Sequence, residues 1–276
     1  MKWFHFILSH SIFIAFCAVA LAFQTSQLRH LDNSVLFYGF IFFATLCSYN
    51  FYWLLSKFSF IYNSSYSAII KNEMTGIFLL IIAAIGLVVC LFYSAINIDH
   101  VIIAVLLTFI YAIPLLPVKE LYFIRKAGVL KTFLLAFTWA YVTAFLPLQK
   151  SWALIDNADV FIITRRFLFM LMLCIIFDNR DKAVDKIRGL RSLATDLRPG
   201  MLRLLIFIIF AVLFGTNFFY KNYELSLSQS IALQVSTLAL LIVYFFSTRK
   251  QGYFFYYFIV DGLMMFSALA TFVAGI

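Results

Sequence analysis

Charged side chains are scarce in this chain: only 12% of its 276 residues are Asp, Glu, Lys or Arg. Soluble domains usually carry about a quarter charged residues and are about half apolar. Here 64% of the residues are hydrophobic, and the mean hydropathy is +1.00. This shortage of charge excludes an ordinary soluble domain. The apolar runs are continuous rather than alternating, which also excludes a transmembrane β-barrel. We therefore expect an all-α, polytopic membrane protein.

Cysteine patterns typical of metal or redox sites are missing as well. The four cysteines lie inside apolar runs, and no two of them stand in a C-x-x-C arrangement. We expect small, buried hydrophobic side chains at Cys17, Cys47, Cys90 and Cys174.

What the chain does contain is a series of apolar runs near the length of about 20 residues that crosses a bilayer as a helix. Nine spans are expected, over residues 4–23, 35–55, 74–96, 99–117, 128–148, 160–177, 201–220, 227–247 and 253–274. The first run also resembles a signal peptide, but the span count favours its retention. No soluble domain fits between the spans, so residues 1–276 form a single domain. A four-helix unit used twice, about 4–117 and 128–247, plus a last helix at 253–274, is a weak internal repeat.

The basic residues predict the orientation of the chain in the membrane, because cytoplasmic connections are enriched in Lys and Arg. With the N-terminus in the cytoplasm, thirteen basic residues fall in inward connections, whereas the outward ones hold only Arg29, Lys150 and Lys221. The net charge of +9 therefore reflects topology rather than nucleic-acid binding. We expect a multi-pass protein of a bacterial-type inner membrane, with its C-terminus outside.

The stretch MLCIIFDNRDKAVDKIRGLRSLATDLRPG, residues 172–200, carries the most distinctive pattern. Asp178, Asp181 and Asp185 stand at i, i+3 and i+7, so on a helix the three carboxylates share one face. Mg²⁺ is commonly held by one or two carboxylates together with substrate phosphates. The interleaved Lys182 and Arg188 would complement a polyanion. The pattern indicates a metal–diphosphate site at the cytoplasmic surface. The alternative is a solvated loop, with Asp178 as a helix cap.

These residues resemble a known family. The segment DNRDKAVDKIRGLRSL is similar to the second aspartate-rich motif of the UbiA superfamily of intramembrane prenyltransferases. The matching positions are Asp181, Asp185, Gly189 and the pair Ser192-Leu193. A second segment, YAIPLLPVKELYFIRKAGVLKTFLLAFTWAYVT, resembles the region that joins the fourth and fifth spans of that family. The residues that match there are Tyr111, Pro114, Lys119, Arg125 and Lys131.

The resemblance implies a nine-helix bundle around a central cavity, where Mg²⁺ helps a polyprenyl diphosphate to transfer its prenyl group to an aromatic or other lipophilic acceptor. Asp181 and Asp185 would be the catalytic metal ligands, with Asp178 beside them. Tyr111 and Asp261 would face the cavity. The diphosphate would contact Asn50, Lys119, Arg125, Lys182 and Arg188.

The first aspartate-rich motif of the family is degenerate in this chain. The stretch LCSYNFYWLLSKFSFIYNSSYS keeps Asn50 but has Phe51, Leu54 and Phe58 where the family carries acidic residues. A neutral amide cannot replace the charge of two or three carboxylates. We therefore expect at most a single Mg²⁺. The two alternatives are action on a different donor and a homologue that has kept the fold and lost the chemistry.

Several charged residues lie within the expected spans. Asp261 is about eight residues into the last span, and an acid at that depth is a functional candidate unless it forms an interhelical hydrogen bond or ion pair. Arg165 and Arg166 lie near the outer end of the 160–177 span, and we expect them to extend outward to the interface.

Three function classes follow from these observations. The first is a membrane prenyltransferase. The second is a catalytically inactive homologue that binds lipid or isoprenoid or has a structural role in the membrane. The third is a transporter or channel, which is least favoured because the charges gather at one surface. The sequence does not indicate the donor length, the acceptor or the oligomeric state.

Overall fold

The computed structural model describes residues 2–59, 73–94, 96–113, 128–187 and 189–276, and all regular elements in these ranges are helical. The α-helices are α1 (Lys2–Ser9), α2 (Ile12–Leu28), α3 (Val35–Ser59), α5 (Met74–Tyr93), α6 (Ile98–Ala112), α7 (Gly128–Ala140), α8 (Asn157–Ile187), α9 (Leu193–Asp196), α10 (Pro199–Thr216), α11 (Leu227–Ser247) and α12 (Asp261–Ala274). Shorter π or 3-10 segments are η4 (Tyr141–Phe145), η5 (Leu146–Leu148), η6 (Trp152–Leu154), η7 (Asn217–Tyr223) and η8 (Phe255–Val260). The expected all-α fold class is confirmed for the described residues.

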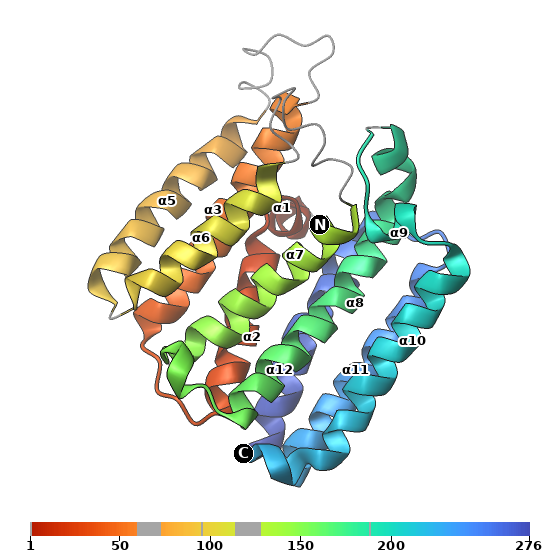
Figure 1. Ribbon diagram of the computed structural model, residues 1–276. Helices are drawn as coiled ribbons and strands as arrows, with labels where there is room; N and C mark the ends of the chain where they lie inside the picture. The colour runs from red at the N-terminus through yellow and green to blue at the C-terminus, as the bar shows by residue number, and fades with distance from the viewer. Residues whose placement is uncertain (1, 60–72, 95, 114–127, 188) are drawn as a thin grey trace.

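The long helices form one bundle, in which α8 lies between α7 and α10 (Figure 1). Helix α8 is the most buried of the candidate spans and contacts α7, α9, α10 and α11. Its run from Phe169 to Ile176 is buried at every position, as expected for a helix that is apolar on all sides. On one side of the bundle α2 packs against α3 and α12, and α3 packs along α5. The fold therefore encloses α8 more than any other candidate span among the described residues.

Seven helices among the described residues are long and apolar enough to cross a membrane. The pair α1 and α2, which meet at an angle of 66°, makes an eighth if it is one bent span. The span expected over 99–117 corresponds to α6, which has 15 residues, and residues 114–127 lie outside the described part. The structure therefore supports a helical multi-pass membrane protein, whereas nine spans stay a prediction.

Helix α8 extends ten residues beyond the expected end of its span at residue 177, so the aspartate segment is helical. Its end is closed by a hydrogen bond from the Leu190 amide to the Asp185 carbonyl, at 2.9 Å. Gly189 has a φ of +66°, a conformation that favours glycine after a helix. The glycine of the motif therefore has a structural reason to be there.

The expectation that Arg165 and Arg166 extend outward is wrong. Both side chains turn into the bundle and are buried, at 8% and 6% exposure. Arg165 donates hydrogen bonds toward α10, η7 and α11, whereas Arg166 donates to α2. Leaving a buried guanidinium donor without a hydrogen bond is costly. The oxygen atoms of the neighbouring helices provide these hydrogen bonds, so the two side chains do not need to reach the membrane interface.

The cysteines behave as expected. Cys17, Cys90 and Cys174 are buried, Cys47 is half-buried, and all four are free thiols.

A cluster of charges joins three loops at the end of the bundle where α2 ends and α8 begins, which we call the Arg29 end. The fully buried Asp159 carboxylate accepts hydrogen bonds from Arg29 Nε at 2.8 Å and Lys150 Nζ at 2.6 Å. Arg29 also pairs with Asp156 and Glu224. The pKa of Asp156 is lowered by the Asp159 amide and by Lys150 and Arg29. Two of the three outward basic residues predicted from the sequence are thus neutralised locally.

Replacing Asp159 with Asn should destabilise the bundle, because Arg29 and Lys150 would lose their buried counter-charge. Breaking a buried ion pair costs about 3 kcal/mol, which corresponds to a melting temperature roughly 5–10 °C lower. Thermal unfolding of the purified protein in detergent measures this. The control is Lys221→Gln, an exposed residue in η7 near the same end, which should change the melting temperature little. Equal effects of the two substitutions would contradict the role given to Asp159.

Candidate functional site

Charged and aromatic side chains meet at the opposite end of the bundle. There the last turns of α8 lie beside the first turns of α7 and the short α9, with the N-terminal α1 on the same side of the molecule (Figure 1). We call this the aspartate end, because Asp178, Asp181 and Asp185 are its most prominent charged groups.

Asp178 joins three helices. Its Oδ2 accepts a hydrogen bond from Thr132 Oγ1 of α7 at 2.5 Å and another from the Leu193 amide of α9 at 3.2 Å. The backbones of α7 and the α9 turn approach so closely that a Cβ on Gly128 would lie 2.5 Å from the Ser192 nitrogen. Asp178 therefore has a structural partner on each side, and this contact is the reason α9 packs against α7.

Asp181 is paired with the neighbouring Arg180. The guanidinium donates from Nε to Oδ1 and from Nη2 to Oδ2, both at 2.7 Å. The same guanidinium lies over the rings of Phe177, Tyr256 and Tyr257, at 4.8, 5.1 and 5.0 Å from their centroids. Its Nη1 is buried and has no hydrogen-bond partner among the described residues. A cation held by aromatic faces, with one donor atom unused, is suited to bind an anion.

Lys131 of α7 supplies a second cation. Its ammonium is close enough to Asp178, Asp181 and Asp185 to interact electrostatically with each of them. Its Nζ also lies 6.0 Å from the centroid of the Tyr111 ring. Asp185 is buried, at 8% exposure. The three aspartates therefore face a fixed positive charge, which reduces the repulsion between them.

Tyrosines line this region on the side of α3 and α6. Tyr52 and Tyr111 are stacked, with centroids 5.1 Å apart and planes inclined by 23°. Tyr49, one turn earlier on α3, meets Trp139 edge to face at 6.1 Å. These rings bring the degenerate first motif next to the region that holds Lys131.

Asn50, the residue retained in the degenerate motif, is buried at 5% exposure. Its Nδ2 donates to the Leu46 carbonyl at 2.8 Å and to the His10 carbonyl at 3.2 Å. His10 lies at the break between α1 and α2, where Ser11 has a φ of +63°. The amide nitrogen of Asn50 therefore holds this bend, which is a structural role that the sequence did not predict.

Asp261 begins α12 directly after the π-helical segment η8 and is buried at 4% exposure. Its carboxylate and the Arg180 guanidinium act on each other electrostatically. The π-helical segment η8 directly precedes Asp261, and such segments are frequent at functional sites.

The structure brings together several residues that the sequence singled out and leaves others undecided. Tyr111, Asp178, Asp181, Asp185 and Asp261 all lie at the aspartate end. Lys182 is half-buried. The remaining basic residues expected to bind diphosphate, Lys119, Arg125 and Arg188, lie outside the described residues.

Sequence reasoning did not single out Arg180, Tyr256 or Tyr257. Arg180 is one of the thirteen basic residues of the inward connections, and because adjacent residues on a helix do not face each other, no spacing signal predicts its ion pair with Asp181. Tyr256 and Tyr257 come from the opposite end of the chain. Only the packing of η8 against α8 reveals their contact with Arg180.

The described residues offer no site at which protein ligands alone would hold a metal, because no three His, Cys, Asp or Glu side chains are grouped suitably there. Asp181 and Asp185, four residues apart on α8, fit a looser arrangement. Mg²⁺ is usually held by one or two carboxylates, with substrate phosphates and water as the other ligands. A magnesium ion at this end would therefore depend on a bound phosphate group.

Comparison with known proteins gives no assignment: no family model, curated protein or solved structure matches the chain.

Replacing Thr132 with Val should loosen the aspartate end. The substitution keeps the shape of the side chain but removes the donor to Asp178, and a buried carboxylate that loses a hydrogen bond costs about 1–3 kcal/mol. Thr138→Val is the matched control, because that half-buried hydroxyl bonds only within α7, to the Leu134 carbonyl. Thermal unfolding in detergent should show a clear loss for the first variant and little change for the second. Indistinguishable melting temperatures of the two variants would contradict a stabilising role for the hydrogen bond between Thr132 and Asp178.

Proposed function

We propose that this protein is a membrane prenyltransferase-like enzyme that binds a polyprenyl diphosphate at the aspartate end. The observation that carries the proposal is the Arg180 guanidinium, which is held against three aromatic rings and keeps a buried, unpartnered Nη1 beside Asp181. The proposal includes the nine-span bundle, with the aspartate end in the cytoplasm. It agrees with the resemblance of residues 178–193 to a prenyltransferase motif.

In this proposal the cations of the site bind the diphosphate. Arg180 Nη1 donates to a phosphate oxygen, and the Lys131 ammonium adds a second positive charge from α7. Lys119, Arg125, Lys182 and Arg188 are further candidates for this contact, and Asn50 contributes at most its amide oxygen. The electrostatic effect grows as the diphosphate departs with more negative charge, so the same cations favour the transition state.

The reaction breaks the bond between C1 of the prenyl chain and the diphosphate oxygen. Pyrophosphate leaves with the electron pair, a new bond forms between C1 and the acceptor, and the acceptor loses a proton. Magnesium held by Asp181 and Asp185, with Asp178 nearby, would neutralise charge on the diphosphate when bound. Aromatic faces can stabilise an allylic cation, and in this proposal the face of Tyr52 that is not stacked on Tyr111 is the candidate for that contact.

A second candidate is a catalytically inactive homologue that binds lipid or isoprenoid. One observation favours it: the charges of the aspartate end are already partly balanced, because Asp181 is paired with Arg180 and Lys131 interacts electrostatically with all three aspartates. Because the first motif has no carboxylates to hold a second metal ion, a protein that binds the ligand without turning it over also fits the sequence.

The two candidates are distinguished by turnover in proteoliposomes. Purified protein should release pyrophosphate from polyprenyl diphosphates in the presence of Mg²⁺ and an aromatic acceptor. Asp181→Asn, Asp185→Asn and Arg180→Gln should each lower the rate by at least about 100-fold, because each removes a group that stabilises developing charge. The control Asp99→Asn changes an exposed carboxylate at the start of α6 and should keep full activity.

Full turnover in both aspartate variants would disprove the metal assignment. Chelator-insensitive binding of the polyprenyl diphosphate with no product, across a panel of acceptors, would instead support the inactive homologue.

A further inference from the structure

Two consecutive arginines lie in the interior of the bundle, far along α8 from the aspartate end. Arg165 and Arg166 are both more than nine-tenths buried. Arg165 donates through both terminal nitrogens to neutral acceptors, namely Leu213 O, Asn217 Oδ1, Leu233 O and Thr237 Oγ1, at 2.8–3.0 Å. Arg166 donates to the Leu21 carbonyl and to the side chains of Gln24 and Thr25 at 2.8–3.3 Å.

None of these acceptors carries a charge. Neither arginine forms an ion pair with an acidic side chain in the described part of the chain, and the charge that acts on Arg166 is that of Arg165. The nearest acid on α8, Asp159, lies roughly 10 Å away along the helix axis and is already paired with Arg29 and Lys150. Arginine keeps its proton in proteins, so this part of the membrane interior holds two positive charges without a negative one.

Arg166 also has unused donors. A guanidinium has five N–H groups, and all hydrogen bonds of Arg166 to other described residues leave from Nη2. Its Nε and Nη1 donate to no other described residue. The Arg166 side chain, to which Nε and Nη1 belong, lines a small cavity.

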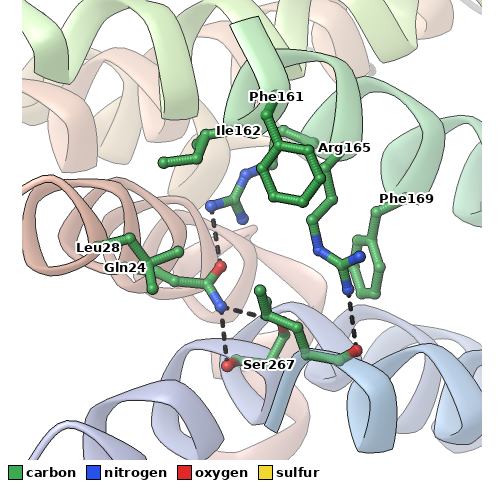
Figure 2. A pocket seen from close by; sticks show the side chains of 9 residues that line it. Gln24, Leu28, Phe161, Ile162, Arg165, Phe169 and Ser267 are labelled. Carbon is green, nitrogen blue, oxygen red and sulfur yellow. Dashed lines mark hydrogen bonds between the residues drawn. The ribbon is translucent and has the colours of Figure 1, made fainter. Parts of the chain in front are cut away.

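That cavity lies between α2, α8, α11 and α12, and both arginines contribute to its wall (Figure 2). Its volume is about 20 Å³, enough for one water-sized particle. Gln24 and Ser267 supply polar atoms, joined by hydrogen bonds of 2.9 and 3.1 Å from Gln24 Nε2. Phe161, Phe169 and Leu233 supply apolar surface. The site is therefore small, polar on one side and positively charged.

We infer that this cavity binds one small monovalent anion of about the size of chloride, held by Arg166 and by the field of Arg165. Burying two like charges is unfavourable unless a counter-charge accompanies them. A water molecule would fill the space but leave the charge in place, whereas a phosphate or a carboxylate chain exceeds the volume. The inference does not depend on the chemistry of the aspartate end.

Bromide tests the site directly in the unmodified protein. Crystals grown in sodium bromide should show an anomalous peak in the cavity, beside Arg166 Nε or Nη1. Chloride should also raise the melting temperature by on the order of 5 °C relative to equal concentrations of gluconate, because a ligand that binds only the folded state stabilises it. Density at this position without anomalous signal would assign it to water and overturn the inference.

Substitutions provide the matched comparison. Arg166→Gln should abolish the difference between chloride and gluconate, whereas Arg203→Gln, which removes an exposed arginine from α10, should leave it intact. If Arg166→Gln does not yield folded protein, the bromide experiment still decides. Equal melting temperatures in chloride and gluconate for the unmodified protein would contradict an anion site.

Discussion

The burial of charge along one helix is the constraint on which the rest of this structure depends. Helix α8 is the most enclosed of the candidate spans, yet it carries Asp159, the pair Arg165-Arg166 and the aspartates from Asp178 to Asp185. A charge removed from water is costly unless a partner compensates it. At each position along α8 that carries a charge, the neighbouring helices must therefore provide a counter-charge or hydrogen-bond partners.

The neighbouring helices are positioned accordingly. At the Arg29 end, the loops after α2 and before α8 converge on Asp159. In the middle, α2 turns backbone and side-chain oxygens toward Arg166, while α10 and α11 do the same for Arg165. At the aspartate end, α7 and α9 close on Asp178, and η8 places aromatic rings against Arg180. Polar contacts thus fix the orientation of helices whose apolar surfaces alone would specify little, since lipid is as apolar as a leucine side chain.

Much of this could be predicted from the sequence, but not all of it. Hydropathy predicted the helical membrane class and most span positions, but it ended the span of α8 at residue 177 and did not predict that the helix continues through the aspartates to Ile187. The sequence did not predict the inward turn of Arg165 and Arg166, because the acceptors come from helices distant in the chain. The structural use of the Asn50 amide at the bend between α1 and α2 was hidden for the same reason. Two explanations exist for Gly189 and the pair Ser192-Leu193. They match a family motif in the sequence, and they also form the turn that packs α9 against the end of α8.

The central claim is that the cations of the aspartate end bind a diphosphate. A structure of the protein in lipid nanodiscs with a non-hydrolysable polyprenyl thiodiphosphate and Mg²⁺ tests it most directly. The account predicts diphosphate density within hydrogen-bond distance of Arg180 Nη1 and Lys131 Nζ, with the prenyl chain running into the bundle beside Tyr52 and Tyr111. Saturating ligand bound elsewhere, with Arg180 still paired only to Asp181, would contradict it.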